Sequence, residues 1–290
     1  MHSLIIFVFF IISIFSTNSY CSIKNYIEYF DIYYSLSESK LNSLDIYLPL
    51  EAANNKVMIM IHGGAWTIGD KRNYSEVRNK IPFFIQNDFI FISLNYRLSP
   101  FVKHPTHIQD VTKAIEWIYK NISEYGGNPY ELYLIGHSSG AHLASLLALD
   151  ENYLSQIDIP NDVIKAVILL DPAALDIKRN IEDYKWGEVY KLIYFNVFGK
   201  NPDIWINASP IYHIDDENNS VAFLTFYSDY IKLVEEITVS FHNSLIENGF
   251  YSEIYKIHKT HGRLNNDVGK QDEEITELLK NFLDTIPDSL

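Results

Sequence analysis

The chain has 290 residues, of which 47% are hydrophobic, and this composition is that of a globular protein with one large core. Its 37 acidic residues outnumber its 23 Lys and Arg residues, which gives a formal net charge of −14. Because no basic cluster accompanies the aromatic residues, the composition argues against nucleic-acid binding.

The first 21 residues contain no Asp, Glu, Lys or Arg, and residues 4–15 form an apolar run. Twelve residues are short for a bilayer span, which needs about 20. The polar run at 16–19 then predicts a signal peptide cleaved near Ser19 or Cys21, hence a secreted protein. Since Lys and Arg are missing before the apolar run, a retained membrane anchor is the alternative. Cys21 is the single cysteine, which excludes a disulfide within the chain.

A continuous apolar run at 57–61 predicts a strand buried on both faces, and His-Gly-Gly-Ala-Trp follows it directly. Glycines at this place let the backbone turn so that N–H groups face a cavity. We expect the N–H groups of Gly64 and Ala65 to be oxyanion donors, with Gly63 shaping the turn.

The segment 136–140 reads Gly-x-Ser-x-Gly between an apolar strand (131–135) and a small-residue helix (141–149). A serine at the tip of such a turn is exposed above the sheet, where a base can take its proton. The pattern therefore predicts Ser138 as a nucleophile and the backbone N–H of Ser139 as a further oxyanion donor.

A serine nucleophile needs a histidine base, and the base needs a carboxylate to orient it. Asp229 follows the buried-strand run 221–227, and the spacing favours it as the acid. Asp171, which follows an earlier strand, is the competitor.

For the base, the strand-like alternation at 251–257 precedes two candidate histidines. These are His258, which is close to the strand end, and His261, which is followed by glycine.

Strands and helices alternate along the chain, which predicts an α/β fold with a mostly parallel sheet covered on both faces. We expect one domain over 22–290. The expected strands are 44–48, 57–61, 89–94, 132–136, 166–171, 221–227 and 251–257. The expected helices are 75–86, 107–122, 139–150, 231–248 and 271–283.

The aromatic-rich segment 175–214 interrupts this alternation of strands and helices. Trp66 and Tyr96, which lie beside the predicted oxyanion strand, are further candidates for substrate contacts.

Two motifs together resemble the α/β-hydrolase superfamily: His-Gly-Gly-x-Trp at 62–66 and Gly-x-Ser-x-Gly-Ala-His at 136–142. Within it, the chain is similar to the esterase/lipase group with hormone-sensitive-lipase-like carboxylesterases, kynurenine formamidases and isoprenylcysteine methylesterases. Similar stretches occur at 69–71, 95–100 and 125–129, and the resemblance runs from about residue 44 to 282. Many relatives carry a third glycine where this chain has Ala65, which leaves the N–H donor in place but puts the substrate class in doubt.

The resemblance implies a serine hydrolase that cleaves carboxylic esters through an acyl-enzyme. In this fold the acid and then the histidine follow the serine, and the histidine lies beside a glycine in the loop after a strand, which favours His261 as the base with His258 as the fallback. The superfamily usually inserts a cap where 175–214 lies, so the resemblance implies a small cap over the nucleophile there.

Hydrolysis of a small-molecule ester through such an acyl-enzyme would need no cofactor and no metal. An arylformamidase and an isoprenylcysteine methylesterase are the sibling alternatives. A catalytically silent relative that serves as a binding module is the alternative from another class.

Overall fold

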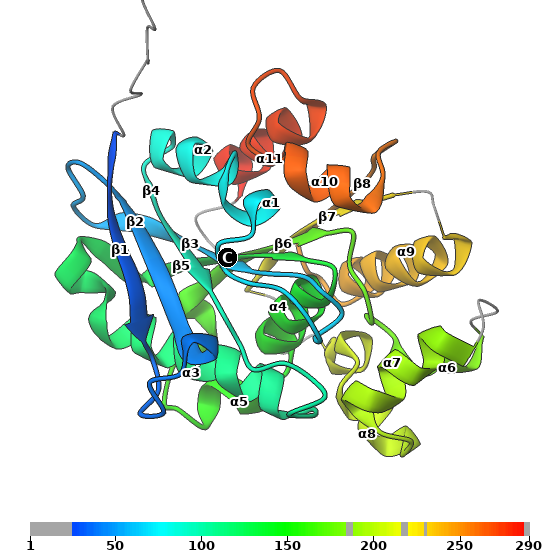
Figure 1. The fold of residues 1–290 in the computed structure, drawn as a ribbon. Coiled ribbons are helices and arrows are strands. Elements are labelled where there is room, and N and C mark those ends of the chain that lie inside the picture. Colours follow the sequence, from blue (N-terminus) through cyan, green and yellow to red (C-terminus); the bar gives the residue numbers. More distant parts are fainter. Residues whose placement is uncertain (1–24, 184–187, 216–219, 229–230, 287–290) are drawn as a thin grey trace, which may run out of the picture.

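In the computed structural model, residues 25–183, 188–215, 220–228 and 231–286 are described, so the predicted leader (1–21) and Asp229 lie outside the described residues. The strands form one eight-stranded sheet in the order β1-β2-β4-β3-β5-β6-β7-β8 (Figure 1). β1 and β2 run antiparallel to their neighbours, and β4, β3, β5, β6, β7 and β8 are parallel to one another. The bounds are β1 Tyr26–Tyr33, β2 Ser43–Pro49, β3 Asn55–Ile61, β4 Phe89–Leu94, β5 Gly127–His137, β6 Ile164–Leu170, β7 Ala222–Tyr227 and β8 Ser252–Lys256. The predicted mostly parallel sheet is thus confirmed.

Alternate residues of the central strands feed two separate apolar cores, one on each face of the sheet. In β3, Val57, Ile59 and Ile61 join one core, whereas Met58 and Met60 join the other. Successive strand side chains point to opposite faces, which is why a strand covered on both sides is apolar throughout.

Helices cover both faces of the sheet (Figure 1). Helices α3, α4 and α9 supply apolar residues to the core that contains Ile59, and α2, α10 and α11 supply them to the core that contains Met58. The bounds are α1 Tyr74–Val77, α2 Lys80–Gln86, α3 Thr106–Asn121, α4 Ser139–Leu149, α5 Asn152–Ser155, α6 Ile177–Glu182, α7 Glu188–Phe198, α8 Pro202–Asn207, α9 Lys232–Glu247, α10 His261–Asp267 and α11 Glu274–Thr285. None of these described helices is both long enough and apolar enough to cross a bilayer.

Several elements differ from the sequence-based expectation. The predicted helix 75–86 is two short helices, α1 and α2, because Pro82 has no N–H to donate and is tolerated only in the first turn of a helix. Strand β1 was not expected, because it lies at the sheet edge and is partly exposed rather than continuously apolar. Helix α10 is only seven residues long, too short for a periodic pattern to reveal.

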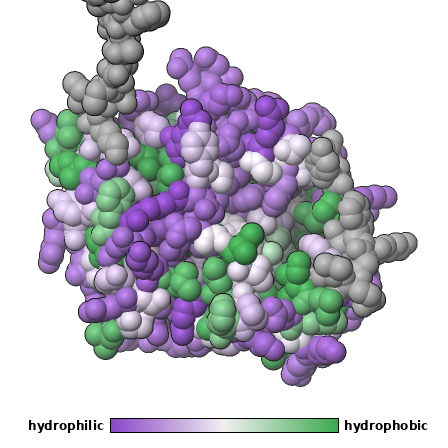
Figure 2. Space-filling view, in the orientation of Figure 1, coloured by the Kyte–Doolittle hydropathy of each residue, from purple (hydrophilic) through white to green (hydrophobic). Residues whose placement is uncertain are grey.

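The segment 175–214 contains the helices α6, α7 and α8. Apolar residues gather on its outer surface over α7 (Figure 2). Inward, Tyr194 and Phe198 of α7 pack edge-on against Trp66, with ring centroids 5.8 and 5.0 Å away. Aromatic contacts therefore hold this segment against the start of the loop that follows β3.

Candidate active site

Ser138 sits at a sharp turn between β5 and α4, with φ 53° and ψ −115°. A positive φ is unfavourable for a residue with a side chain, so the surrounding packing must impose it. A Cβ on Gly136 would lie 2.4 Å from the Gly140 carbonyl oxygen, and one on Gly140 would lie 2.0 Å from that of Ile61. Both glycines are therefore required, and the turn is pressed against the end of β3.

The loop after β3 lies directly against this nucleophile turn. A Cβ on Gly63 would be 2.8 Å from His137 Nδ1 and 3.3 Å from Ser138 Cβ. Gly64 has φ 119°, a conformation that disfavours any other residue, and Ala65 lines the same cavity as Ser138. The loop expected to carry oxyanion donors is thus beside the predicted nucleophile.

The structure places Tyr96 behind this loop and not among the residues that line the cavity. Its ring stacks on His62 with centroids 4.4 Å apart, and its hydroxyl donates to the His62 carbonyl oxygen at 3.0 Å. Tyr96 is fully buried, so it supports the loop rather than offering a surface to a ligand. Trp66, in contrast, contributes to the cavity wall.

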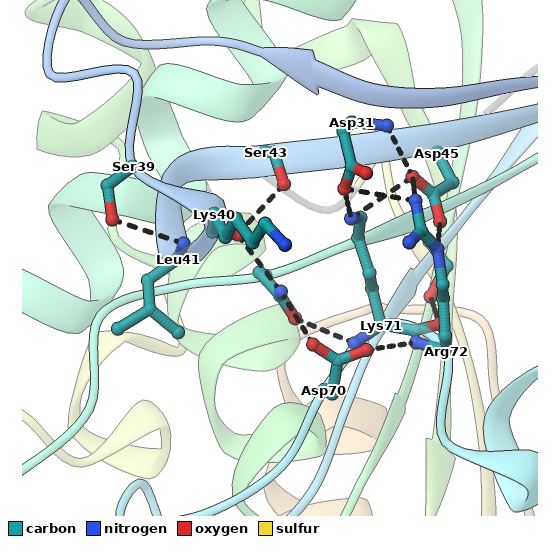
Figure 3. Close-up of polar contacts among 11 residues, drawn as sticks. Asp31, Ser39, Lys40, Leu41, Ser43, Asp45, Asp70, Lys71 and Arg72 are labelled. Carbon is teal, nitrogen blue, oxygen red and sulfur yellow. Dashed lines mark hydrogen bonds and ion pairs between the residues drawn. The ribbon is translucent and has the colours of Figure 1, made fainter.

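Charged side chains anchor the far end of the same loop on the antiparallel edge of the sheet (Figure 3). Lys71 Nζ lies 2.6 Å from Asp31 Oδ1 and 3.1 Å from Asp45 Oδ1. Arg72 Nε lies 2.6 Å from Asp45 Oδ2. Because Lys71 and Asp45 are buried, each charge depends on its partner for stability there. These ion pairs fix the chain just after the Gly-Asp pair at 69–70.

The base predicted from sequence, His261, is the first residue of α10, and it bonds to a carboxylate. Its Nδ1 is 2.7 Å from Asp171 Oδ2. Because an ionised carboxylate only accepts, Nδ1 carries the proton and Nε2 is left to act as a base. His261 lines the cavity together with Ser138 and Asp171.

Asp171 is held by more than the histidine. Ser228 donates to it twice, from its backbone N–H to Oδ1 at 2.9 Å and from its hydroxyl to Oδ2 at 2.8 Å. Burial alone would raise the pKa of Asp171, but the hydrogen bonds from His261 and Ser228 bring it below its ordinary value. The carboxylate is therefore ionised at neutral pH and rigidly oriented.

The predicted acid Asp229 lies outside the described residues, and the partner of His261 in the described part of the chain is Asp171. From the sequence alone Asp171 ranks second to Asp229, because loop aspartates are more often turn or cap residues. The sequence pattern does not single out Ser228, although a hydroxyl at the end of a buried strand is a usable signal.

A cavity of about 490 Å³ opens beside these residues. Its walls are mainly apolar, with Ile193 of α7 and Val234 and Ile237 of α9 among the lining residues. Among the described lining residues, Asp171 is the one charged side chain apart from any charge on His261. The cavity thus suits a neutral, apolar group next to Ser138.

His137, which precedes the nucleophile, is buried with its ring centroid 4.4 Å from that of His261. Burial lowers the pKa of His137 to about 3. A neutral His137 places no second positive charge beside the base. Within the described ranges, no group of three or more His, Cys, Asp or Glu side chains is arranged to hold a metal ion.

Comparisons with known proteins identify the family, several relatives and solved structures of the same fold. The family model described as BD-FAE matches residues 44–238. Esterase LipQ of Mycobacterium tuberculosis is 40% identical over 114 residues, which are 38% of this chain and 27% of that protein. The chain thus spans about a quarter of the length of LipQ. Kynurenine formamidase of Meyerozyma guilliermondii is 28% identical over 242 residues, which cover 76% of this chain and 86% of that protein. A solved structure of a truncated carbohydrate esterase from gut microbiota has a TM-score of 0.74 at 20% identity and covers 90% of this chain and 96% of that chain.

Proposed function

This chain belongs to the BD-FAE family and has the α/β-hydrolase fold, and from that we propose that it hydrolyses carboxylic esters through a covalent acyl-enzyme. The observation that carries the proposal is the 2.7 Å bond between His261 Nδ1 and Asp171 Oδ2 at the wall of the cavity that Ser138 also lines. Nucleophile, base and acid in one cavity are the parts that acyl transfer requires.

In the proposed mechanism, Ser138 Oγ forms a bond to the ester carbonyl carbon while His261 Nε2 takes the hydroxyl proton. Asp171 holds the ring and stabilises the imidazolium. The N–H groups of Gly64, Ala65 and Ser139 hold the negative oxygen of the tetrahedral intermediate.

The ester C–O bond then breaks, and the alcohol leaves with the proton from His261. A water molecule repeats the sequence, giving its proton to His261 and its oxygen to the acyl carbon. The acid is released and the Ser138 hydroxyl is restored.

The apolar walls support a substrate whose cavity-bound part is neutral. A carboxylate or phosphate there would lose its hydration and face Asp171 without any described cationic side chain to replace that water. We therefore propose esters with uncharged acyl or alcohol groups.

Labelling with a fluorophosphonate tests the serine chemistry. The wild-type chain is expected to be labelled and to hydrolyse p-nitrophenyl acetate, and Ser138→Ala is expected to lose both. A wild-type chain that is neither labelled nor active would favour the binding-module alternative.

A second candidate is arylformamidase activity, since the similarity to kynurenine formamidase covers 76% of this chain. The same serine, base and oxyanion donors would cleave a formamide C–N bond. Comparing kcat/KM for N-formylkynurenine and p-nitrophenyl acetate separates the two: a higher value for the formamide would replace the ester proposal.

A further inference from the structure

Lys80, the first residue of α2, is completely buried and uses all three of its ammonium protons. It donates to the Ser75 carbonyl oxygen at 2.7 Å, to the Asn265 carbonyl oxygen at 2.6 Å and to Asn265 Oδ1 at 2.8 Å. Asn265 lies on α10, one turn after His261. Two of the three bonds therefore fasten α2 to the helix that begins with the proposed base.

Glu76 of α1 connects the same helix to the loop after β3. Asn265 Nδ2 donates to Glu76 Oε1 at 3.1 Å. The Gly63 backbone is close enough to the Glu76 carboxylate to favour its charged form, although Glu76 Oε2 itself makes no hydrogen bond to a described residue. Figure 1 shows α1 between α2 and α10, on one side of the sheet. The side chains of Lys80, Glu76 and Asn265 thus span the gap between the loop and His261.

The charges of this network are themselves mutually dependent. Burial lowers the pKa of Lys80 to about 8 and raises that of Glu76 above its ordinary value, while each charge stabilises the other. Removing one partner would leave a buried charge without compensation, which is strongly unfavourable. None of the three residues lines the cavity, so they do not touch a ligand there.

We propose that Lys80, Glu76 and Asn265 are positioning residues. They keep the loop after β3, which carries the proposed oxyanion donors, at a fixed distance from His261, so that both stay in place around Ser138. The inference rests on the proposed hydrolase function. A shift of about 1 Å in catalytic groups can lower turnover by roughly 100-fold. A network that fixes both sides of the site should accordingly act on kcat and leave KM almost unchanged.

The test compares Lys80→Met with Glu76→Gln/Lys80→Met, in which no buried charge is left without a partner. The full chain is assayed with p-nitrophenyl acetate below the melting temperature of every variant, and fluorophosphonate labelling counts the competent serines. Both variants should lose roughly 10-fold to 100-fold in kcat per labelled site, with KM within about twofold. The matched control is Ile118→Ala on α3, a buried residue in the core on the opposite face of the sheet from α2 and α10. This variant should have a lower melting temperature but an unchanged kcat per labelled site.

The inference is overturned if the double variant turns over like wild type, or if its loss of kcat is no larger than that of Ile118→Ala. Should Lys80→Met fail to fold, Lys80→Arg keeps the charge but changes the bond geometry, and the same loss of kcat is expected. Inactivity of the wild-type chain would instead refute the proposed function, so the two failures are distinct.

Discussion

The orientation of one imidazole depends on a carboxylate that is itself held from three directions. Asp171 accepts hydrogen bonds from His261 Nδ1, from the Ser228 N–H and from the Ser228 hydroxyl. A carboxylate with this many donors cannot turn away from the histidine without leaving buried groups unpaired. The proposed acid therefore sets both the tautomer and the direction of the base.

Substituting the two candidate acids separates them. Asp171→Asn should lower kcat by roughly 10⁴-fold, because the amide presents the wrong hydrogen-bond pattern to Nδ1. Asp229→Asn should change kcat by no more than a few-fold. Steady-state kinetics with p-nitrophenyl acetate checks both, and the reverse ranking would make Asp229 the acid.

At the scale of single elements, the nucleophile turn is defined by close approaches that only glycine permits. Helix α4 begins at Ser139 with the Gly140 backbone against the end of β3. Helix α10, by contrast, has open space around its second residue, Gly262, where an added Cβ would meet nothing within 4 Å. Gly140 and Gly262 each lie in the first turn of a helix, but only Gly262 has room for a side chain.

This contrast predicts opposite changes in the free energy of unfolding. Gly140→Ala should destabilise the protein by more than about 3 kcal/mol, since the added carbon collides with backbone that cannot move aside. Gly262→Ala should stabilise it by about 0.5–1 kcal/mol, because alanine loses less backbone entropy in a helix. Urea denaturation measures both free energies of unfolding, and equal changes in the two variants would contradict this prediction.

Helix α7 supplies part of the cavity wall, so its side chains should set the size of the group accepted. Ile193 lines the cavity, so Ile193→Trp reduces its volume and should lower kcat/KM for a p-nitrophenyl hexanoate at least about tenfold more than for the acetate. The ratio of the two constants is the measurement. A ratio equal to that of wild type would mean that this part of the cavity is not used by the acyl chain.

Across the whole molecule, several histidines are buried and neutral. Burial lowers the pKa of His62 and His107 to about 4 and that of His142 to about 3. The tautomer of His142 is set by its neighbours, since Trp66 Nε1 donates to its Nδ1 at 3.3 Å and its Nε2 donates to the Ala208 carbonyl oxygen at 2.7 Å. Protonating such a ring would break the first of these contacts.

These pKa values predict acid sensitivity. In the unfolded chain these histidines titrate near 6.5, so it binds more protons than the folded protein below that pH. Their contribution to stability is complete above about pH 6.5 and is lost as pH falls toward the folded values. The free energy of unfolding, measured in urea, should therefore drop by several kcal/mol between pH 7 and pH 5, at about 1.4 kcal/mol per histidine per pH unit. A constant value over this range would contradict neutral buried histidines.

The sequence alone determined the mostly parallel sheet, because continuous apolar runs and short glycine turns are local patterns that report burial and backbone shape. For the same reason it placed Ser138 and the loop at 62–66 at strand ends. The carboxylate that reaches His261 was decided by the tertiary structure. Strands β6 and β7 are adjacent and parallel, so an aspartate after either one arrives at the same edge of the sheet.

Local sequence patterns also do not reveal the residues that support the site from behind. Tyr96 follows a strand next to the loop, yet the packing of His62 turns it into the core instead of the cavity. Lys80 and Asn265 are 185 positions apart and meet only because α1 and α2 fold over α10. Contacts at such separation depend on how whole elements pack, which no short stretch of sequence records.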